Sequence, residues 1–89
     1  MKTRYLKCTY GKGLFKEEYL INFNSANQNW CSVNKTDIIP LDEKNGYVKC
    51  QLASKQEREA IIVINDVGDH RQSSFRVNIS DLVLKAKAA

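Results

Sequence analysis

The sequence predicts an all-β fold: a small six-stranded barrel formed by two three-stranded repeats that a pseudo-two-fold axis relates. The first observation is that short stretches of the chain recur. Residues 5–8 (YLKC) return as residues 47–50 (YVKC), and residues 33–39 (VNKTDII) return as residues 77–83 (VNISDLV). Laid without gaps, residues 5–23 match residues 47–65, with apolar agreement as far as Ile21 and Val63. Matches in the same order at similar offsets indicate an internal duplication.

The second observation is that six short segments show the alternation of half-buried strands, with turn-forming residues between them. Closing such strands into a barrel removes exposed sheet edges. A five-stranded SH3-like or OB-like barrel is the alternative. Residues 1–89 form one domain, with repeats at approximately 4–41 and 46–84 and a tail at 85–89. The six expected strands are residues 4–10, 15–23, 30–33, 47–52, 59–65 and 75–79.

In the first repeat, the alternating residues 4–10 and 15–23 flank a Gly-Lys-Gly turn signal at 11–13, so they are expected to form a hairpin. The polar run 24–29 is rich in residues that make their own turn hydrogen bonds and predicts a loop. Pro40 should end the element before it, because proline lacks an N–H and disfavours a helical residue in front of it. An Asn-Gly turn at 45–46 is expected to connect the repeats.

Two helical alternatives arise in the second repeat. Residues 54–57 (SKQE) fit a capping box, which would start a helix over 55–64. The β-branched run inside 59–65 favours a central strand instead. A short C-terminal helix is expected over 80–89, because Ser80 can cap it and good helix formers follow.

The composition is that of a soluble domain, with 43% apolar and 27% charged residues. Net charge is +4 and divides evenly, since residues 1–44 and 45–89 each carry seven basic and five acidic groups. This balance permits nucleic acid or an acidic protein as a partner and requires neither. The longest apolar run, residues 60–64, is too short to span a bilayer, and residues 1–5 lack the apolar stretch of a signal peptide. The expected location is therefore the cytoplasm, with no membrane partner.

Cysteine usage points to packing rather than to redox or metal chemistry. The chain has three cysteines, no C-x-x-C motif and no histidine at zinc-ligand spacing. Cys8 and Cys50 occupy equivalent repeat positions and are predicted to be small buried hydrophobes. If their strands were neighbours, a disulfide between them would be feasible, but a cytosolic setting argues against it.

One face of the first and fourth expected strands combines aromatic and basic side chains. Interleaved rings and cations suit single-stranded nucleic acid, because bases stack on rings while phosphates pair with cations. The competing interpretation is cross-strand pairing on a solvated sheet face, which recurrence in both repeats favours. The residues of this candidate surface are Tyr5, Lys7, Tyr47 and Lys49, with Arg76 and Arg4 expected nearby.

Three further features have a binding and a structural interpretation. Trp30 has no aromatic counterpart in the second repeat and is either a contact anchor or, as favoured, a core residue. Asp66, Asp69 and His70 share a loop and could bind metal, but no third protein ligand has a recognisable spacing, so a solvated turn is favoured. The recurring pairs Asn34/Asp37 and Asn78/Asp81 are expected to close turns through their side chains.

These features favour a small non-enzymatic module that acts through protein–protein contact, with no catalytic residues, metal or cofactor. The alternative is a nucleic-acid-binding barrel that uses the Tyr/Lys face. An enzyme is disfavoured, because so small a core leaves little room for a pocket. A homodimer would extend the core of so short a chain.

Overall fold

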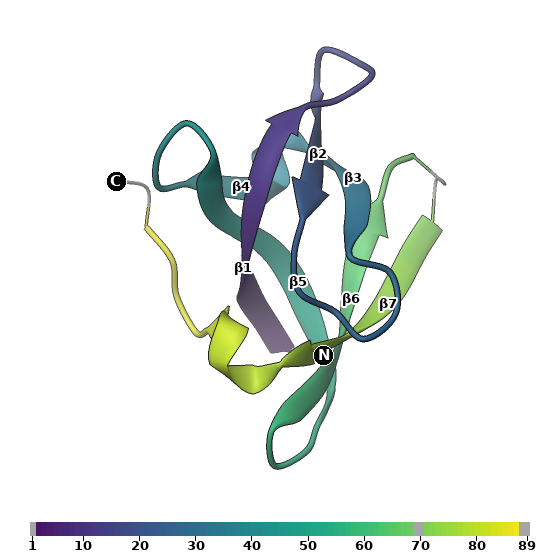
Figure 1. Cartoon of the computed structure of the whole chain (residues 1–89), viewed down its shortest axis with the longest axis vertical. Coiled ribbons are helices and arrows are strands. Elements are labelled where there is room, and N and C mark those ends of the chain that lie inside the picture. Colours follow the sequence, from purple (N-terminus) through teal and green to yellow (C-terminus); the bar gives the residue numbers. More distant parts are fainter. Residues whose placement is uncertain (1, 69–70, 88–89) are drawn as a thin grey trace.

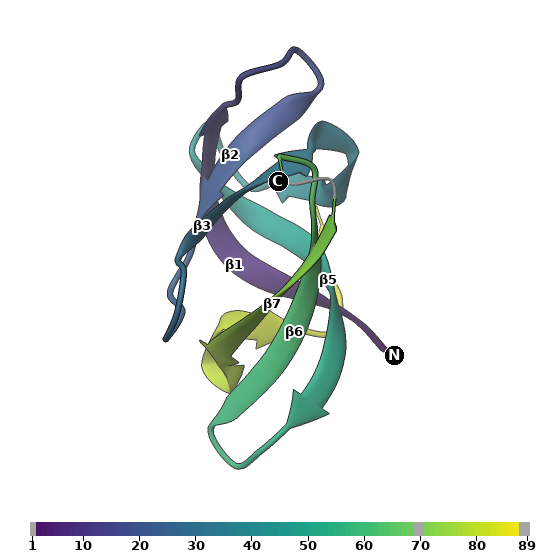
Figure 2. The ribbon, with the colours of Figure 1, turned by 90° about the vertical axis from the view of Figure 1, so that its right-hand side faces the viewer.

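The computed structural model describes residues 2–68 and 71–87 and shows one antiparallel sheet curled into a half-barrel (Figures 1 and 2). The six expected strands are present, and two short strands and two 3₁₀ turns join them. The elements are β1 (Lys2–Lys12), β2 (Glu18–Asn22), β3 (Trp30–Asn34), η1 (Lys35–Asp37), β4 (Ile38–Pro40), β5 (Asn45–Lys55), β6 (Glu59–Asp66), β7 (Arg71–Asn78), η2 (Ile79–Asp81) and β8 (Leu82–Val83). The all-β prediction is confirmed.

The sheet divides into two halves with the same connectivity. Its main path runs β3-β2-β1-β5-β6-β7, so the long strands β1 and β5 lie side by side at the centre. The short strand that ends each half pairs with the first strand of the other half: β4 pairs with β5, and β8 pairs with β1. Each half thus completes the sheet of the other.

The pair Leu6 and Val48 lies at the centre of this symmetry. On either side of it, Tyr5 lies opposite Lys49 and Lys7 lies opposite Tyr47. Exchanging the halves converts one of these pairs into the other, so the β1–β5 ladder is two-fold symmetric about its central pair. The pseudo-two-fold arrangement follows from this register, whereas a common origin of the halves stays a prediction.

A difference in hairpin length shifts the equivalence of the outer strands by one residue. Tyr10 pairs with Ile21, and Leu52 pairs with Ile62, so Ile21 and Ile62 are equivalent. The ungapped match would instead align Ile21 with Val63, which faces the opposite side of the sheet. The turn of the second hairpin is two residues shorter, with 57–58 in place of 14–17, and the irregularity between Leu52 and Ser54 adds one residue back. The net shift of one residue matters because it turns every side chain of a strand to the other face.

The inner face of the sheet forms one apolar core, in which β-branched, leucine and phenylalanine side chains enclose Cys8, Cys31 and Cys50. The prediction that Cys8 and Cys50 are buried is confirmed, and the three thiols are free. Desolvation by burial raises the pKa of each thiol to about 12, so the neutral form dominates at physiological pH. Although β1 and β5 are neighbours, Cys8 lies opposite Gly46 and Cys50 lies opposite Arg4.

Two local predictions are wrong. In place of a C-terminal helix, residues 79–83 form η2 and β8, because Leu82 pairs with Leu6 and packs against the core. The connector does not turn at Asn45-Gly46, since both residues belong to β5. The turn lies just before them, where the Asp42 carboxylate accepts hydrogen bonds from the N–H groups of Lys44 (2.8 Å) and Asn45 (2.7 Å). These hydrogen bonds lower the pKa of Asp42.

Loops cover the two edge strands of the half-barrel. The loop between β2 and β3 crosses to β7, where the Ala26 N–H donates to the Arg76 carbonyl at 3.0 Å (Figure 1). In the other half, the Val67 N–H donates to the Ser32 carbonyl of β3 at 2.9 Å. These loops therefore protect edges that strand pairing leaves open. Within the described residues, no helix is long and apolar enough to cross a bilayer.

Candidate binding surfaces

The outward face of β1 and β5 brings together four of the residues predicted to form a binding surface. Tyr5 lies directly opposite Lys49, and Lys7 lies directly opposite Tyr47, so all four share one face. Both lysines are exposed and both tyrosines are half-buried. We call these four residues the Tyr/Lys face.

Two grooves of equal volume flank the Tyr/Lys face and are related by the pseudo-two-fold axis. Each has a volume of about 310 Å³ and combines a lysine of a long strand with an aspartate of a 3₁₀ turn. The aspartate offsets the lysine charge and reduces the attraction of the face for phosphate. The first groove is lined by Lys7, Cys8, Thr9, Asn22, Phe23, Asn24, Asn29, Asn45 and Asp81. The second is lined by Asp37, Lys49, Cys50, Gln51, Val63, Asn65 and Gln72.

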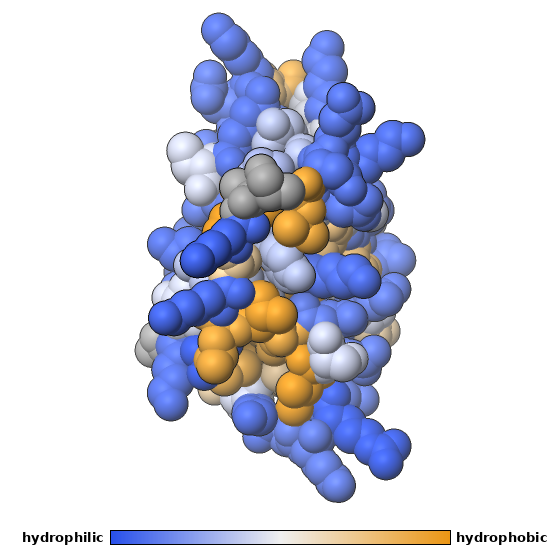
Figure 3. All heavy atoms as spheres, turned by 90° about the vertical axis from the view of Figure 1, so that its left-hand side faces the viewer, coloured by the Kyte–Doolittle hydropathy of each residue, from blue (hydrophilic) through white to orange (hydrophobic). Residues whose placement is uncertain are grey.

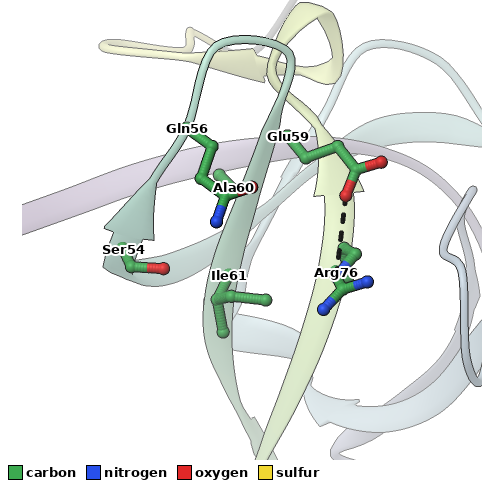
Figure 4. A pocket seen from close by; sticks show the side chains of 6 residues that line it. All are labelled: Ser54, Gln56, Glu59, Ala60, Ile61 and Arg76. Carbon is green, nitrogen blue, oxygen red and sulfur yellow. Dashed lines mark ion pairs between the residues drawn. The ribbon is translucent and has the colours of Figure 1, made fainter.

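The two arginines expected near the Tyr/Lys face lie elsewhere. Arg76 is on β7, two strands away from β5, and its Nε lies 3.6 Å from the Glu59 carboxylate (Figure 4). The pocket beside this ion pair has a volume of about 50 Å³, far below the roughly 300–1,000 Å³ of small-molecule sites. Arg4 follows the inward parity of Leu6, and its Nη1 donates to the Thr3 carbonyl at 2.8 Å.

Trp30 is exposed, so its favoured assignment to the core is wrong. Its side chain is 51% accessible, whereas its neighbour Cys31 is fully buried. Strand alternation explains the difference, because Cys31 and Val33 point inward and Trp30 therefore points outward. The register places Trp30 opposite Asn22, and the equivalent position in the second half is Ser74.

The loop between β1 and β2 exposes two large apolar side chains that the strand pattern of the sequence does not predict to be at the surface. Leu14 and Phe15 are 90% and 68% exposed in the loop between β1 and β2, which projects from one end of the molecule (Figure 1). The sequence pattern places Phe15 at the start of a strand, but β2 begins at Glu18. The available signal was an apolar pair directly after a Gly-Lys-Gly turn. We call residues 13–17 the apolar loop.

Backbone contacts hold the apolar loop in one conformation. The Glu18 N–H donates to the Phe15 carbonyl at 3.1 Å, and the Gly13 N–H donates to the Glu18 carbonyl at 3.3 Å. The Lys35 N–H of η1 donates to the Glu17 carbonyl at 2.9 Å. Below the loop, the rings of Tyr10 and Tyr19 lie 4.8 Å apart. The loop is therefore braced from both strands and from η1.

The equivalent turn of the second half has the same brace and a different surface. The Gln56 N–H donates to the Glu59 carbonyl at 2.8 Å, and the Ile79 N–H of η2 donates to the Arg58 carbonyl at 3.0 Å. Residues 56–58 are all polar and exposed. The fold thus closes this hairpin without apolar side chains at its tip.

A second apolar surface lies where η2 and the C-terminal segment run along the sheet (Figure 3). A groove of about 210 Å³ opens there between Leu52, Leu82 and the exposed Leu84. Hydrophilic side chains frame the apolar patch in Figure 3, and the basic residues Arg4 and Lys55 belong to the groove lining. Leu82 lines this groove and also packs against the core, so part of the groove lies where β8 meets the core.

Two further predictions concern polar loops. Asp66 is buried, and its Oδ1 accepts a hydrogen bond from the Gly68 N–H at 3.0 Å, whereas Asp69 and His70 lie outside the described residues. Across residues 2–68 and 71–87, no three side chains are grouped as metal ligands. The expected side-chain turn closure is wrong for Asn34 and Asn78, which make no capping bond because backbone hydrogen bonds close η1 and η2.

Comparison with known proteins reveals no relative: no family model, no curated protein and no solved structure matches the chain. The chemistry of the exposed surfaces is therefore the basis on which a function is inferred. Among these surfaces, the apolar loop and Trp30 occur in one half only, whereas the Tyr/Lys face recurs in both.

Proposed function

We propose that this protein is a small non-enzymatic binding module that contacts a protein partner through the apolar loop. The observation that supports this is the exposure of two adjacent large apolar side chains, Leu14 and Phe15, at a projecting tip. Exposed apolar groups of this kind mark interaction sites, and a few buried anchors supply most of the binding energy of an interface.

The conformation of the loop supports the same function. Binding costs less when the contacting segment is already ordered in the free protein. Gly13 allows the close return of the chain, because a Cβ at this position would lie 2.8 Å from the Glu18 carbonyl oxygen. Together with the hydrogen bonds at Glu17 and Glu18, this fixes where Leu14 and Phe15 project.

The two halves differ at equivalent hairpin turns, and this difference indicates that the apolar residues of the apolar loop serve function rather than folding. The turn at 56–58 occupies the equivalent hairpin and is polar, so the architecture does not require apolar residues there. Exposed leucine and phenylalanine side chains carry a cost in solubility. Their presence in one half is best explained by a partner that buries them.

The double variant Leu14→Ser, Phe15→Ser is expected to lose at least about 30-fold in affinity for the captured partner, as for a hot spot of 2 kcal/mol or more. Its stability should stay within about 0.5 kcal/mol of the unmodified chain, because both side chains are exposed. Affinity capture from a lysate of the source organism, followed by titration calorimetry with the recovered protein, measures the effect.

The matched control is Gln56→Ser, Arg58→Ser in the equivalent turn, which should capture the same partner with unchanged affinity. If the Leu14/Phe15 variant captures the same proteins as the unmodified chain, the apolar loop is not the contact surface.

A second candidate function is binding of single-stranded nucleic acid at the Tyr/Lys face. The register favours it, because each tyrosine lies directly beside a lysine of the neighbouring strand. Stacking of a base on an aromatic ring contributes about 1–3 kcal/mol. Asp37 and Asp81 in the flanking grooves oppose it by offsetting the lysine charges.

On this second hypothesis, Tyr47→Ala, Lys49→Ala should weaken binding of fluorescein-labelled oligo(dT) about tenfold or more, as the loss of one stacked base and one phosphate contact implies. Fluorescence anisotropy at low and physiological salt measures it, with Gln51→Ala on the same strand as the control. An unchanged affinity in the double variant, or no binding by the parent chain at low salt, would exclude this surface.

A further inference from the structure

We propose that the first groove, beside Trp30, binds an uncharged oligosaccharide. This site lies beyond the apolar loop and is independent of the protein contact proposed there. The register builds it as a row across four strands: Trp30 on β3 lies opposite Asn22 on β2, which lies opposite Thr9 on β1, which lies opposite Asn45 on β5. Opposed side chains in such a row have Cβ atoms about 4.5–5.5 Å apart, so a ligand can contact several of them together.

The polar lining of the groove suits hydroxyl groups. Asn22, Asn24 and Asn29 are exposed, and within residues 2–68 and 71–87 none of their side-chain amides has a hydrogen bond to another residue. Each amide offers both donors and an acceptor, which matches hydroxyls that donate and accept. Thr9 adds a hydroxyl to the same lining.

The charge of the groove selects against phosphate. Lys7 and Asp81 are its charged side chains, and their opposite signs leave the lining with no net charge. A nucleic acid strand would bring its phosphates close to the Asp81 carboxylate, which repels them. A neutral ligand meets no such penalty, and the lysine and aspartate can each hydrogen-bond to a hydroxyl.

Trp30 lies outside the groove lining, one strand beyond Asn22, and would extend the site with an apolar surface. Its indole is 51% exposed and stands at the end of the row next to Asn22. A pyranose ring has one face of C–H groups and a rim of hydroxyls. Packing that face on the indole while the rim meets the amides uses both chemical characters of the ligand, as in binding sites where few polar groups fix the orientation on an apolar surface.

The loop that carries Asn24 and Asn29 is held in place before any ligand arrives. Its Asn27 side chain donates to the Ser74 carbonyl at 3.3 Å and accepts from the Arg76 N–H at 3.2 Å. The Phe23 N–H donates to the Asn29 carbonyl at 3.0 Å across the base of the loop. Ordering of this loop therefore adds little to the cost of binding.

The second groove provides an internal comparison. It has the same volume and the same lysine–aspartate pair, Lys49 with Asp37. The position equivalent to Trp30 is Ser74, so this groove lacks an aromatic platform. The folding role common to both halves does not explain an exposed tryptophan in one of them. The first groove is therefore expected to bind the ligand, and the second is not.

The test is titration of the unmodified chain with cellohexaose, maltohexaose and chitohexaose to about 10 mM, which detects Kd values near 1 mM. Trp30 fluorescence and ¹⁵N–¹H spectra report binding. At least one sugar should give a saturable change in fluorescence and shift the side-chain amides of Asn22 and Asn29, with no shift for Gln51 or Gln72 in the second groove.

Trp30→Ala should weaken this binding at least tenfold, and Ser74→Ala at the equivalent position should leave it unchanged. Spectra of both variants establish that they fold. If none of the three sugars binds, or if Trp30→Ala binds as the unmodified chain does, the inference is wrong. If oligo(dT) shifts the same amides and the sugars do not, the groove binds nucleic acid instead. Leu14 and Phe15 lie outside this groove, so partner capture by the apolar-loop variant tests the proposed protein contact without testing the sugar site.

Discussion

Leu6→Ala is expected to destabilise the fold by about 2–5 kcal/mol, the range for removing a leucine side chain from a packed core. Leu6 has no accessible surface and lies opposite Val48 at the centre of the β1–β5 ladder. It also pairs with Leu82, so both halves and the C-terminal strand pack around it. A cavity at this position cannot close without moving the two central strands.

Thermal unfolding followed by circular dichroism measures the effect, and a decrease in Tm of more than about 10 °C is expected for a chain of this size. The matched control is Leu20→Ala, because Leu20 is 38% exposed on the outer face of β2. That variant should lose much less stability than Leu6→Ala. Equal losses from the two variants would show that Leu6 is not at the centre of the core.

Gly46→Ala is expected to cost about 1–3 kcal/mol, the usual penalty for overpacking. A Cβ at residue 46 would lie 2.7 Å from the Ile39 carbonyl oxygen and 3.2 Å from the Pro40 Cα, both of which are backbone atoms. The Tyr10 ring, at 3.3 Å, closes the remaining side. Since backbone cannot rotate away as a side chain can, β4 must move from its place beside β5.

Gly11→Ala is the control, because a Cβ at residue 11 meets nothing within 4 Å. That substitution should leave stability unchanged or raise it by up to about 1 kcal/mol, since alanine loses less conformational entropy on folding. In urea, Gly46→Ala should unfold at a lower concentration than the parent chain. Gly11→Ala should unfold at the same concentration as the parent chain or at a higher one. If Gly46→Ala unfolds at the same urea concentration as the parent chain, β4 is not held against β5 as the structure shows.

Much of the strand pattern was readable because strands have a period of two. Leu6 and Cys8, and Val48 and Cys50, alternate with polar or half-exposed neighbours, and all four are buried as that pattern predicts. The recurrence of the YxKC motif also predicted that β1 and β5 would be equivalent. Their direct pairing then brings the Tyr/Lys face together.

Other features depend on contacts between segments far apart in the sequence. Residues 80–89 have good intrinsic helix propensity, but Leu82 gains more by pairing with Leu6 and entering the core than a short terminal helix would provide. The strands β4 and β8 have only three and two residues, and each is extended because it pairs with the opposite half. No local pattern distinguishes such segments from turns.

At the candidate sites, too, the sequence reveals the residue types and the tertiary structure decides which of them are exposed. The size of the Trp30 side chain favours the core, but inward-facing Cys31 and Val33 leave Trp30 on the outer face. Phe15 fitted the alternation of a strand, yet the chain turns between Gly13 and Glu18. In both cases the hydrophobicity was visible in the sequence, and its exposure was not.

By itself, the sequence determined the all-β class, the succession of six strands along the chain and the burial of Cys8 and Cys50, because local alternation and turn residues encode them. Only the tertiary structure decided which apolar groups remain at the surface: Leu14, Phe15 and Trp30. The physical reason is that exposure depends on which face of a strand the register turns inward and on what packs against it. Both are fixed by pairing between the two halves rather than by neighbours along the chain.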